Sequence, residues 1–192
     1  RRWEFDIRRG QITLRPRLTG ITTTADADST TAICNNSVDF DNADVYGDYI
    51  TRIWTSGSTS YGNTTFRALS GVKTTGVATF TVATPIPTAM TLVSSSLFYA
   101  EYILPDTVRN ILRVTHQEEE LTLEQIDPVV EFDELYPQPH VRTGTPEVVS
   151  VGGFDVPTYF AGGDAATPSL RMIVWPVPDA AYVLDYTYHY RH

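Results

Sequence analysis

The sequence predicts an α+β protein in which β-structure predominates. Short runs that alternate apolar and polar residues recur along most of the chain, only residues 121–135 have apolar residues near helical spacing, and residues 182–190 alternate tyrosines with polar residues. With 192 residues, 42% of them hydrophobic and 19% charged, the chain has material for one large or two small cores. We therefore expect a folded protein rather than a disordered one.

The N-terminal residues have the pattern of an extended chain. Trp3, Phe5 and Ile7 alternate with charged residues, and the alternation resumes after Gly10 and continues to residue 18. Pro16 within this run indicates the edge of a sheet, because proline has no N–H to donate to a neighbouring strand.

Residues 19–96 differ in composition from both flanks. They are rich in Thr, Ser, Gly and Ala and show no helical periodicity. Short strands separated by turn residues are typical of a small barrel or sandwich. The predicted elements are strands at residues 30–33, 49–54, 64–69 and 77–82 and one helical turn at residues 42–46. We expect residues 19–96 to be a β domain inserted into a discontinuous core domain of residues 1–18 and 97–192.

The C-terminal half predicts strands, one or two helices and a terminal hairpin. A helix is expected at about residues 121–135, which Pro128 would kink or split. The other predicted elements are strands at residues 98–104, 111–115 and 156–160 and a β-hairpin at residues 169–191. In the second strand of that hairpin, one face carries Tyr182, Leu184, Tyr186, Tyr188 and Tyr190. A face this aromatic must be covered, either within the chain or by a neighbouring subunit.

The charge is negative overall and unevenly distributed. A net charge of -9 argues against wrapping nucleic acid through its phosphates. Six arginines lie within the first seventeen residues, whereas residues 118–134 hold eight acids and no Lys or Arg. Two interpretations remain open: head-to-tail assembly in which these segments meet, or two solvated faces.

No motif for catalysis or metal binding is evident, so we assign no catalytic, metal or cofactor-binding residue and expect no cofactor. Phosphate loops, nucleotide fingerprints, nucleophile elbows and metalloprotease His pairs are absent from the sequence. The acids at residues 26–28 and 39–44 resemble calcium loops without the glycine and glutamate of an EF-hand, so solvated loops are favoured. Glu118–Glu120 fit a helix N-terminus better than a catalytic role. Trp3, Trp54 and Trp175 fit burial better than sugar stacking.

The order of several motifs resembles the head–tail adaptor (connector) proteins of tailed bacteriophages. An aromatic Trp3-Glu4-Phe5 stretch precedes the Thr/Ser/Gly-rich insertion with its Tyr46–Ile50 step. The remaining matching motifs are Tyr102–Asp106, Phe132–Pro137, Gly144–Pro146 and Pro176–Tyr188. Members of that family usually open with helices that pack on the portal side, and none is evident before Trp3.

The resemblance implies a non-enzymatic structural protein of the virion. It implies a homo-oligomeric ring, expected to be dodecameric, that is made in the host bacterial cytoplasm and sits at the head–tail junction. The portal protein would lie above the ring and a tail or second neck protein below it. DNA would pass through the channel without sequence readout, and no membrane is involved.

Two sets of residues are candidates for these contacts. The candidate subunit interface comprises Trp3, Phe5, Arg8, Arg9, Tyr182, Tyr186, Tyr188 and Tyr190. The candidate acidic channel or interface surface comprises Glu118, Glu119, Glu120, Glu124 and Asp127. The alternatives are a tail-tube or tail-terminator protein, or a receptor- or carbohydrate-binding β module; a two-carboxylate glycosidase ranks last because no acid pair stands out.

Overall fold

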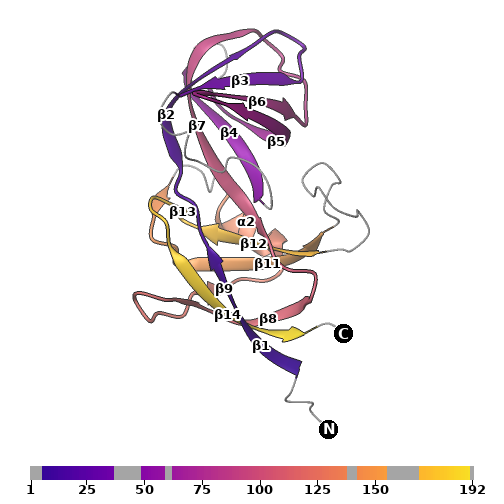
Figure 1. Cartoon of the computed structure of the whole chain (residues 1–192), viewed down its shortest axis with the longest axis vertical. Coiled ribbons are helices and arrows are strands. Elements are labelled where there is room, and N and C mark those ends of the chain that lie inside the picture. Colours follow the sequence, from indigo (N-terminus) through magenta and orange to yellow (C-terminus); the bar gives the residue numbers. More distant parts are fainter. Residues whose placement is uncertain (1–5, 37–48, 59–61, 138–141, 155–168, 191–192) are drawn as a thin grey trace. The chain divides into compact units, whose positions relative to one another are not determined.

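The computed structural model describes residues 6–36, 49–58, 62–137, 142–154 and 169–190 (Figure 1). The described chain is mostly β with one helix, so the predicted fold class is confirmed. It divides into two compact units. The described part of unit 1 comprises residues 6–16, 101–137, 142–154 and 169–190, and that of unit 2 comprises residues 17–36, 49–58 and 62–100. The units change at residues 16/17 and 100/101, whereas the composition of the sequence changes at 18/19 and 96/97.

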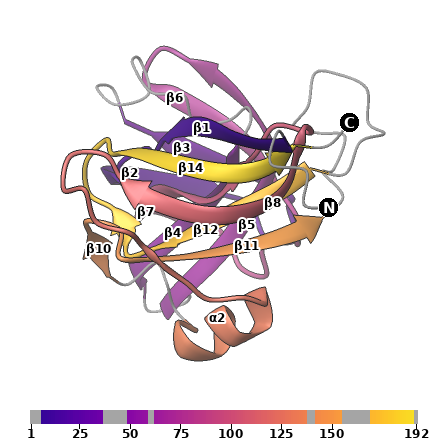
Figure 2. The same ribbon diagram turned by 90° about the horizontal axis from the view of Figure 1, so that it is seen from below.

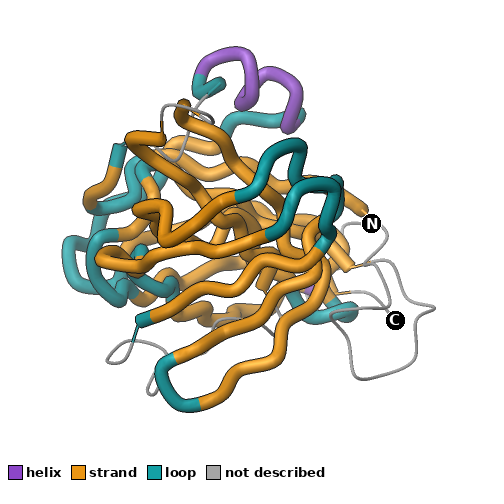
Figure 3. Tube along the Cα trace, turned by 90° about the horizontal axis from the view of Figure 1, so that it is seen from above, coloured by secondary structure: helices purple, strands orange, loops and turns teal. Residues whose placement is uncertain are grey.

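Unit 2 is a closed β-barrel. Its strands are β2 (Leu18–Ala25), β3 (Thr31–Asn35), β4 (Tyr49–Ser58), β5 (Gly62–Thr74), β6 (Val77–Val82) and most of β7 (Met90–Ile103). They are hydrogen-bonded in the order β2-β3-β6-β5-β4-β7, and β7 pairs in turn with β2, which closes the sheet. In Figure 3, the orange strands of this sheet curve around a common centre.

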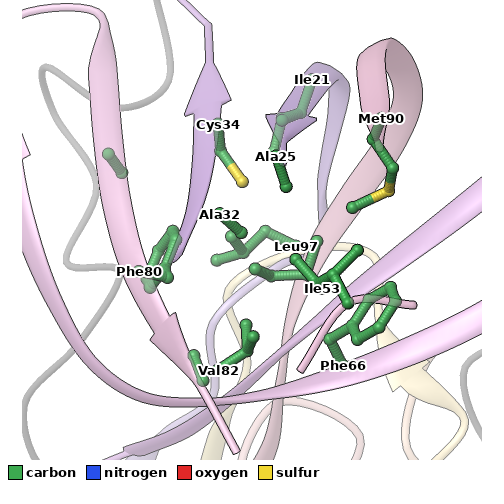
Figure 4. Packing of buried hydrophobic residues seen from close by; sticks show 13 residues of the cluster. Ile21, Ala25, Ala32, Cys34, Ile53, Phe66, Phe80, Val82, Met90 and Leu97 are labelled. Carbon is green, nitrogen blue, oxygen red and sulfur yellow. The ribbon is translucent and has the colours of Figure 1, made fainter. Parts of the chain in front are cut away.

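The barrel is filled by side chains from alternate positions of its strands. In β6, Ala78, Phe80 and Val82 are buried while the residues between them are partly or fully exposed. Figure 4 shows how side chains from the other strands meet them in one cluster. The cluster comprises Ile21, Ala25, Ala32, Cys34, Ile53, Phe66, Ala68, Ala78, Phe80, Val82, Ile86, Met90 and Leu97. This interior is a packed core rather than a channel.

Unit 1 contains two larger sheets and a short strand pair (Figure 2). The first sheet has the order β1-β14-β8, and the second consists of the end of β7 followed by β12, β11 and β9. Strand β10 pairs with β13 in parallel. The bounds are β1 (Ile7–Thr13), β8 (Val108–His116), β9 (Glu124–Gln125), β10 (Thr143–Gly144), β11 (Val148–Phe154), β12 (Ser169–Trp175), β13 (Val177–Pro178) and β14 (Val183–Tyr190).

The predicted C-terminal hairpin is wrong. Both strands exist, but β12 pairs with β11 and β7, whereas β14 lies between β1 and β8 in the other sheet. Pro176 and Pro178 between them have no N–H groups for a continuous ladder. The chain therefore crosses from one sheet to the other, and β14 becomes a central strand.

The predicted helix at residues 121–135 is wrong in its first half. The helix, α2, spans Val129–Leu135 and follows directly after Pro128. Before it, the N–H of Leu123 donates to the carbonyl of Val114, and β9 runs parallel to β11. These residues extend the two sheets, because their backbone groups find partners there. Glu118–Glu120 therefore precede extended chain, not a helix N-terminus. The predicted helical turn at 42–46 and strand at 156–160 lie outside the described residues.

Candidate interaction surfaces

The tyrosine face of β14 is covered by unit 1 itself. Leu184, Tyr186 and Tyr188 are 0%, 4% and 9% exposed, which confirms that they share a buried face. Gly10 is the register partner of Tyr186, and a Cβ there would lie 2.4 Å from the ring Cζ. The Tyr186 ring therefore lies across β1 at a position that only glycine leaves open.

Two further candidate tyrosines also have intramolecular contacts. The Tyr182 hydroxyl donates to Asp179 Oδ1 at 2.6 Å, and this hydrogen bond is the largest cause of the raised pKa of Tyr182. The Arg8 guanidinium lies 3.6 Å from the ring centroid of Tyr190, a cation–π contact. In the described part of the candidate interface, Arg8 and Arg9 are exposed, whereas Tyr186 and Tyr188 are buried. Trp3 and Phe5 lie outside the described residues.

The outer face of the β1-β14-β8 sheet is polar and holds a hollow of about 840 Å³. Along each strand, side chains of this outer face alternate with side chains of the buried tyrosine face. Arg9 therefore lies beside Thr187, and Gln11 lies beside Asp185. Beyond β14, Arg113 and Thr115 of β8 complete the register across the sheet. The hollow is lined by Arg9, Gly10, Gln11, Arg113, Thr115, His116, Gln117, Glu120, Asp185, Tyr186 and Thr187. Arg9 and Glu120, from oppositely charged segments of the sequence, thus line the same hollow.

The acidic candidates do not form one uniform surface. Glu118, Glu119, Glu120 and Glu124 are exposed. Asp127 is exposed too, but its Oδ1 accepts a hydrogen bond from the Val151 N–H at 2.9 Å. Its Oδ2 accepts another from the Gln125 side chain. Asp127 therefore holds the segment before α2 against β11.

Helix α2 carries an acidic and apolar surface. Phe132 is completely buried, whereas Val130 and Leu135 are 65% and 57% exposed. Glu131, Asp133 and Glu134 are exposed beside them. The exposure of these acids is expected from the sequence, but the exposure of the aliphatic residues is not. The apolar spacing in residues 121–135 instead suggests that the aliphatic side chains form a buried stripe.

A buried ion pair and a buried histidine support the fold of unit 1. Arg171 and Glu101 form an ion pair with Nη1 and Oε2 2.9 Å apart, their side chains 5% and 11% exposed. His116, 1% exposed, accepts a hydrogen bond at Nδ1 from the Glu119 N–H and packs edge-on against Tyr182. The contact with Glu119 ties the end of β8 to the following turn.

Cys34 and Trp175, two residues whose side chains often carry chemistry, are both held by packing contacts. Within the described residues, no group of three or more His, Cys, Asp or Glu side chains is arranged to hold a metal ion. Burial raises the pKa of the Cys34 thiol to about 11, which keeps it protonated and unreactive. Trp175 stacks on Tyr136 with ring centroids 4.2 Å apart and lies 4.6 Å from the Arg142 guanidinium, so its ring already has partners.

The comparisons with known proteins give no family for this chain. Neither models of protein families, nor curated proteins, nor solved structures match it. In the described part of the chain, no helix is long and apolar enough to cross a membrane.

Proposed function

We propose that this chain is a structural virion protein that acts as a head–tail adaptor. Copies of it form a ring, expected to be dodecameric, beneath the portal, link the capsid to the tail and line part of the DNA channel. The protein works through assembly and catalyses no reaction.

The observation on which this proposal rests is the presence of two oppositely charged exposed surfaces on unit 1. Arg9 of β1 is exposed at one sheet, as are Arg109 and Arg113 of β8, whereas α2 exposes only acids and aliphatic residues. A ring needs such a heterologous contact, in which one surface of a subunit meets a different surface of the next. The order of the sequence motifs supports the same function.

The barrel fits the role of a self-contained module within such a subunit. Its closed sheet leaves no strand edge for pairing with another chain, and its interior is filled by its own side chains. Association through backbone pairing would therefore fall to unit 1, where β1 pairs only with β14 among the described strands.

The net charge of -9 suits a passive DNA channel. A negatively charged wall repels phosphate, so DNA would slide past without being held. Such a wall makes no base contacts and reads no sequence.

The test is to locate the chain in a virus particle. Particles that carry an epitope-tagged copy should bind gold-labelled antibody at the head–tail junction, and image reconstruction should place a ring of this chain directly below the portal. Label along the tail would favour a tail-tube or tail-terminator protein, and label at fibre tips a receptor-binding module. The absence of the chain from particles would refute the proposal.

A further inference from the structure

We propose that the outer face of the β1-β14-β8 sheet receives helix α2 of a second copy of this chain. This inference rests on the proposed function, because it names the two surfaces that would join neighbouring subunits of the ring. Both surfaces belong to unit 1, so one folded unit carries the complete contact.

The receiving surface, here called the basic sheet face, combines charge, apolar side chains and a hollow. Arg9 and Arg113 line the hollow together with the carboxylates of Asp185 and Glu120, and Arg109 is exposed on β8. This excess of positive charge occurs in a chain whose net charge is -9. Ile7 and Leu112 are 45% and 42% exposed on the same strands. The hollow of about 840 Å³ has room for several side chains of a partner.

Helix α2 has the complementary chemistry. Its three exposed acids, Glu131, Asp133 and Glu134, face no Lys or Arg within the helix. Val130 and Leu135 expose aliphatic surface that no other described part of the folded chain covers. Phe132 anchors the helix in unit 1, so the helix would be presented in a fixed position.

The two surfaces favour a head-to-tail arrangement over a two-fold dimer. Figure 2 shows β1 and α2 at opposite sides of unit 1. A two-fold contact of the basic sheet face with itself would bring like charges together, and edge pairing of two β1 strands would gather four arginines, Arg8 and Arg9 of each copy. A contact between different surfaces repeats from copy to copy and closes into a ring.

The contact is expected to be weak for an isolated pair. A stable interface usually buries about 800 Å² on each partner, more than a seven-residue helix offers by itself. In a closed ring each copy makes two such contacts, so closure stabilises what a single pair does not. Association should therefore rise steeply with protein concentration.

The experiment uses charge reversal on each surface, with association measured by sedimentation velocity over a concentration series. The sheet variant carries Arg9→Glu and Arg113→Glu, and the helix variant carries Glu131→Lys and Glu134→Lys. A control, Asp26→Lys, changes one exposed acid on the barrel. Circular dichroism and urea unfolding establish that each variant is folded like the wild type.

The inference makes a distinct prediction for each sample. Each variant alone should need about tenfold more protein to associate, or more, because about 1.4 kcal/mol of lost charge pairing is tenfold in affinity. An equimolar mixture should associate again as alternating copies, because both contacts between unlike variants pair opposite charges, whereas both contacts between like variants repel. A chain with all four reversals should recover association, and Asp26→Lys should match the wild type.

Cross-linking provides a second measurement that does not depend on charge. In a Cys34→Ala background, a chain with Leu112→Cys and Val130→Cys should give a ladder of oligomers on oxidation. Either single-cysteine variant can form no species beyond a dimer.

The inference is overturned if reversed variants associate like the wild type, if the mixture associates no better than either variant alone, or if the ladder is absent. It is also overturned if the wild type stays monomeric at the highest soluble concentration. None of these outcomes refutes the adaptor function, which depends on where the chain lies in the particle.

Discussion

Gly10 offers a direct test of the packing between β1 and β14. Replacing Gly10 with alanine places a Cβ 2.4 Å from Tyr186 Cζ and 2.6 Å from its hydroxyl oxygen. Carbon atoms pack favourably at about 3.5–4.0 Å, so the ring would have to move by about 1 Å. Tyr186 is only 4% exposed, and its surroundings leave little room for this movement.

The expected effect is a net destabilisation. Overpacking of this kind costs about 1–3 kcal/mol. Alanine also recovers roughly 0.5–1 kcal/mol, because glycine loses more conformational freedom on folding. Gly10→Ala should therefore lower the free energy of unfolding by about 1–2 kcal/mol, which moves a urea midpoint by roughly 0.5–1 M.

The assay should report on unit 1 alone. In a Trp3→Phe, Trp54→Phe background, the remaining tryptophan is Trp175, which stacks on Tyr136 in unit 1. Its fluorescence in urea then follows the unfolding of that unit.

Two comparisons isolate the clash. In a Tyr186→Leu background, Gly10→Ala should become neutral or slightly stabilising, because the ring is gone. Gly144→Ala, whose Cβ would meet Pro176 Cγ at 4.0 Å, should change stability by less than about 0.5 kcal/mol. If Gly10→Ala costs the same with leucine at position 186, the close approach of the ring is not the cause and the reasoning fails.

Three further predictions concern buried groups. Burial raises the pKa of the Cys34 thiol from 9.0 to about 11, so between these pH values the thiol ionises in the unfolded chain but not in the folded one. The free energy of unfolding should therefore fall by on the order of 2–3 kcal/mol as the pH rises from about 9 to about 11. The accompanying fall in melting temperature should be smaller for Cys34→Ala. Glu101→Ala should destabilise unit 1 by about 3–5 kcal/mol in urea because it leaves Arg171 charged and buried, whereas replacing both with Leu and Met should cost far less. Phe132→Ala should lower the free energy of unfolding by about 3–5 kcal/mol, because Phe132 is completely buried. Val130→Ala, at an exposed position of the same helix, should lower it by less than about 0.5 kcal/mol. Equal values for the two variants would refute the anchoring of α2 by Phe132.

Sequence reasoning was most accurate where a structure depends on neighbouring residues. The predicted strand at residues 77–82 coincides with β6, because an apolar alternation follows a turn at Gly76, which has a φ of +69°. The shared face of Leu184, Tyr186 and Tyr188 was also predicted correctly, since side chains of a strand alternate whatever the strand pairs with.

The errors arose where distant segments compete for the same backbone groups. Residues 121–126 have an apolar spacing that suits a helix, yet their N–H and C=O groups pair with β8 and β11. Strands β12 and β14 are neighbours in sequence, but each pairs with strands that lie elsewhere along the chain. Local propensity is weak compared with such tertiary pairing.

The candidate surfaces show the same division. The arginines near the N-terminus and the acids after residue 118 are visible in the sequence, and so is their opposite charge. Their position in the folded chain cannot be read from the sequence. Glu120 lines the same hollow as Arg9, Asp127 is hydrogen-bonded to β11, and the acids of α2 are exposed. Arg109 and Arg113 join the basic sheet face only because β8 pairs with β14.

The order of residues along this chain was enough to establish its β character, its turns and which side chains of each strand lie together, because these follow from backbone geometry over a few residues. Folding in three dimensions determined which strands pair, how the barrel closes through β2 and β7, and which charges and aliphatic groups remain in water. Those outcomes depend on burying surface between segments far apart in the chain, and the free energy of such contacts is not encoded in any local pattern.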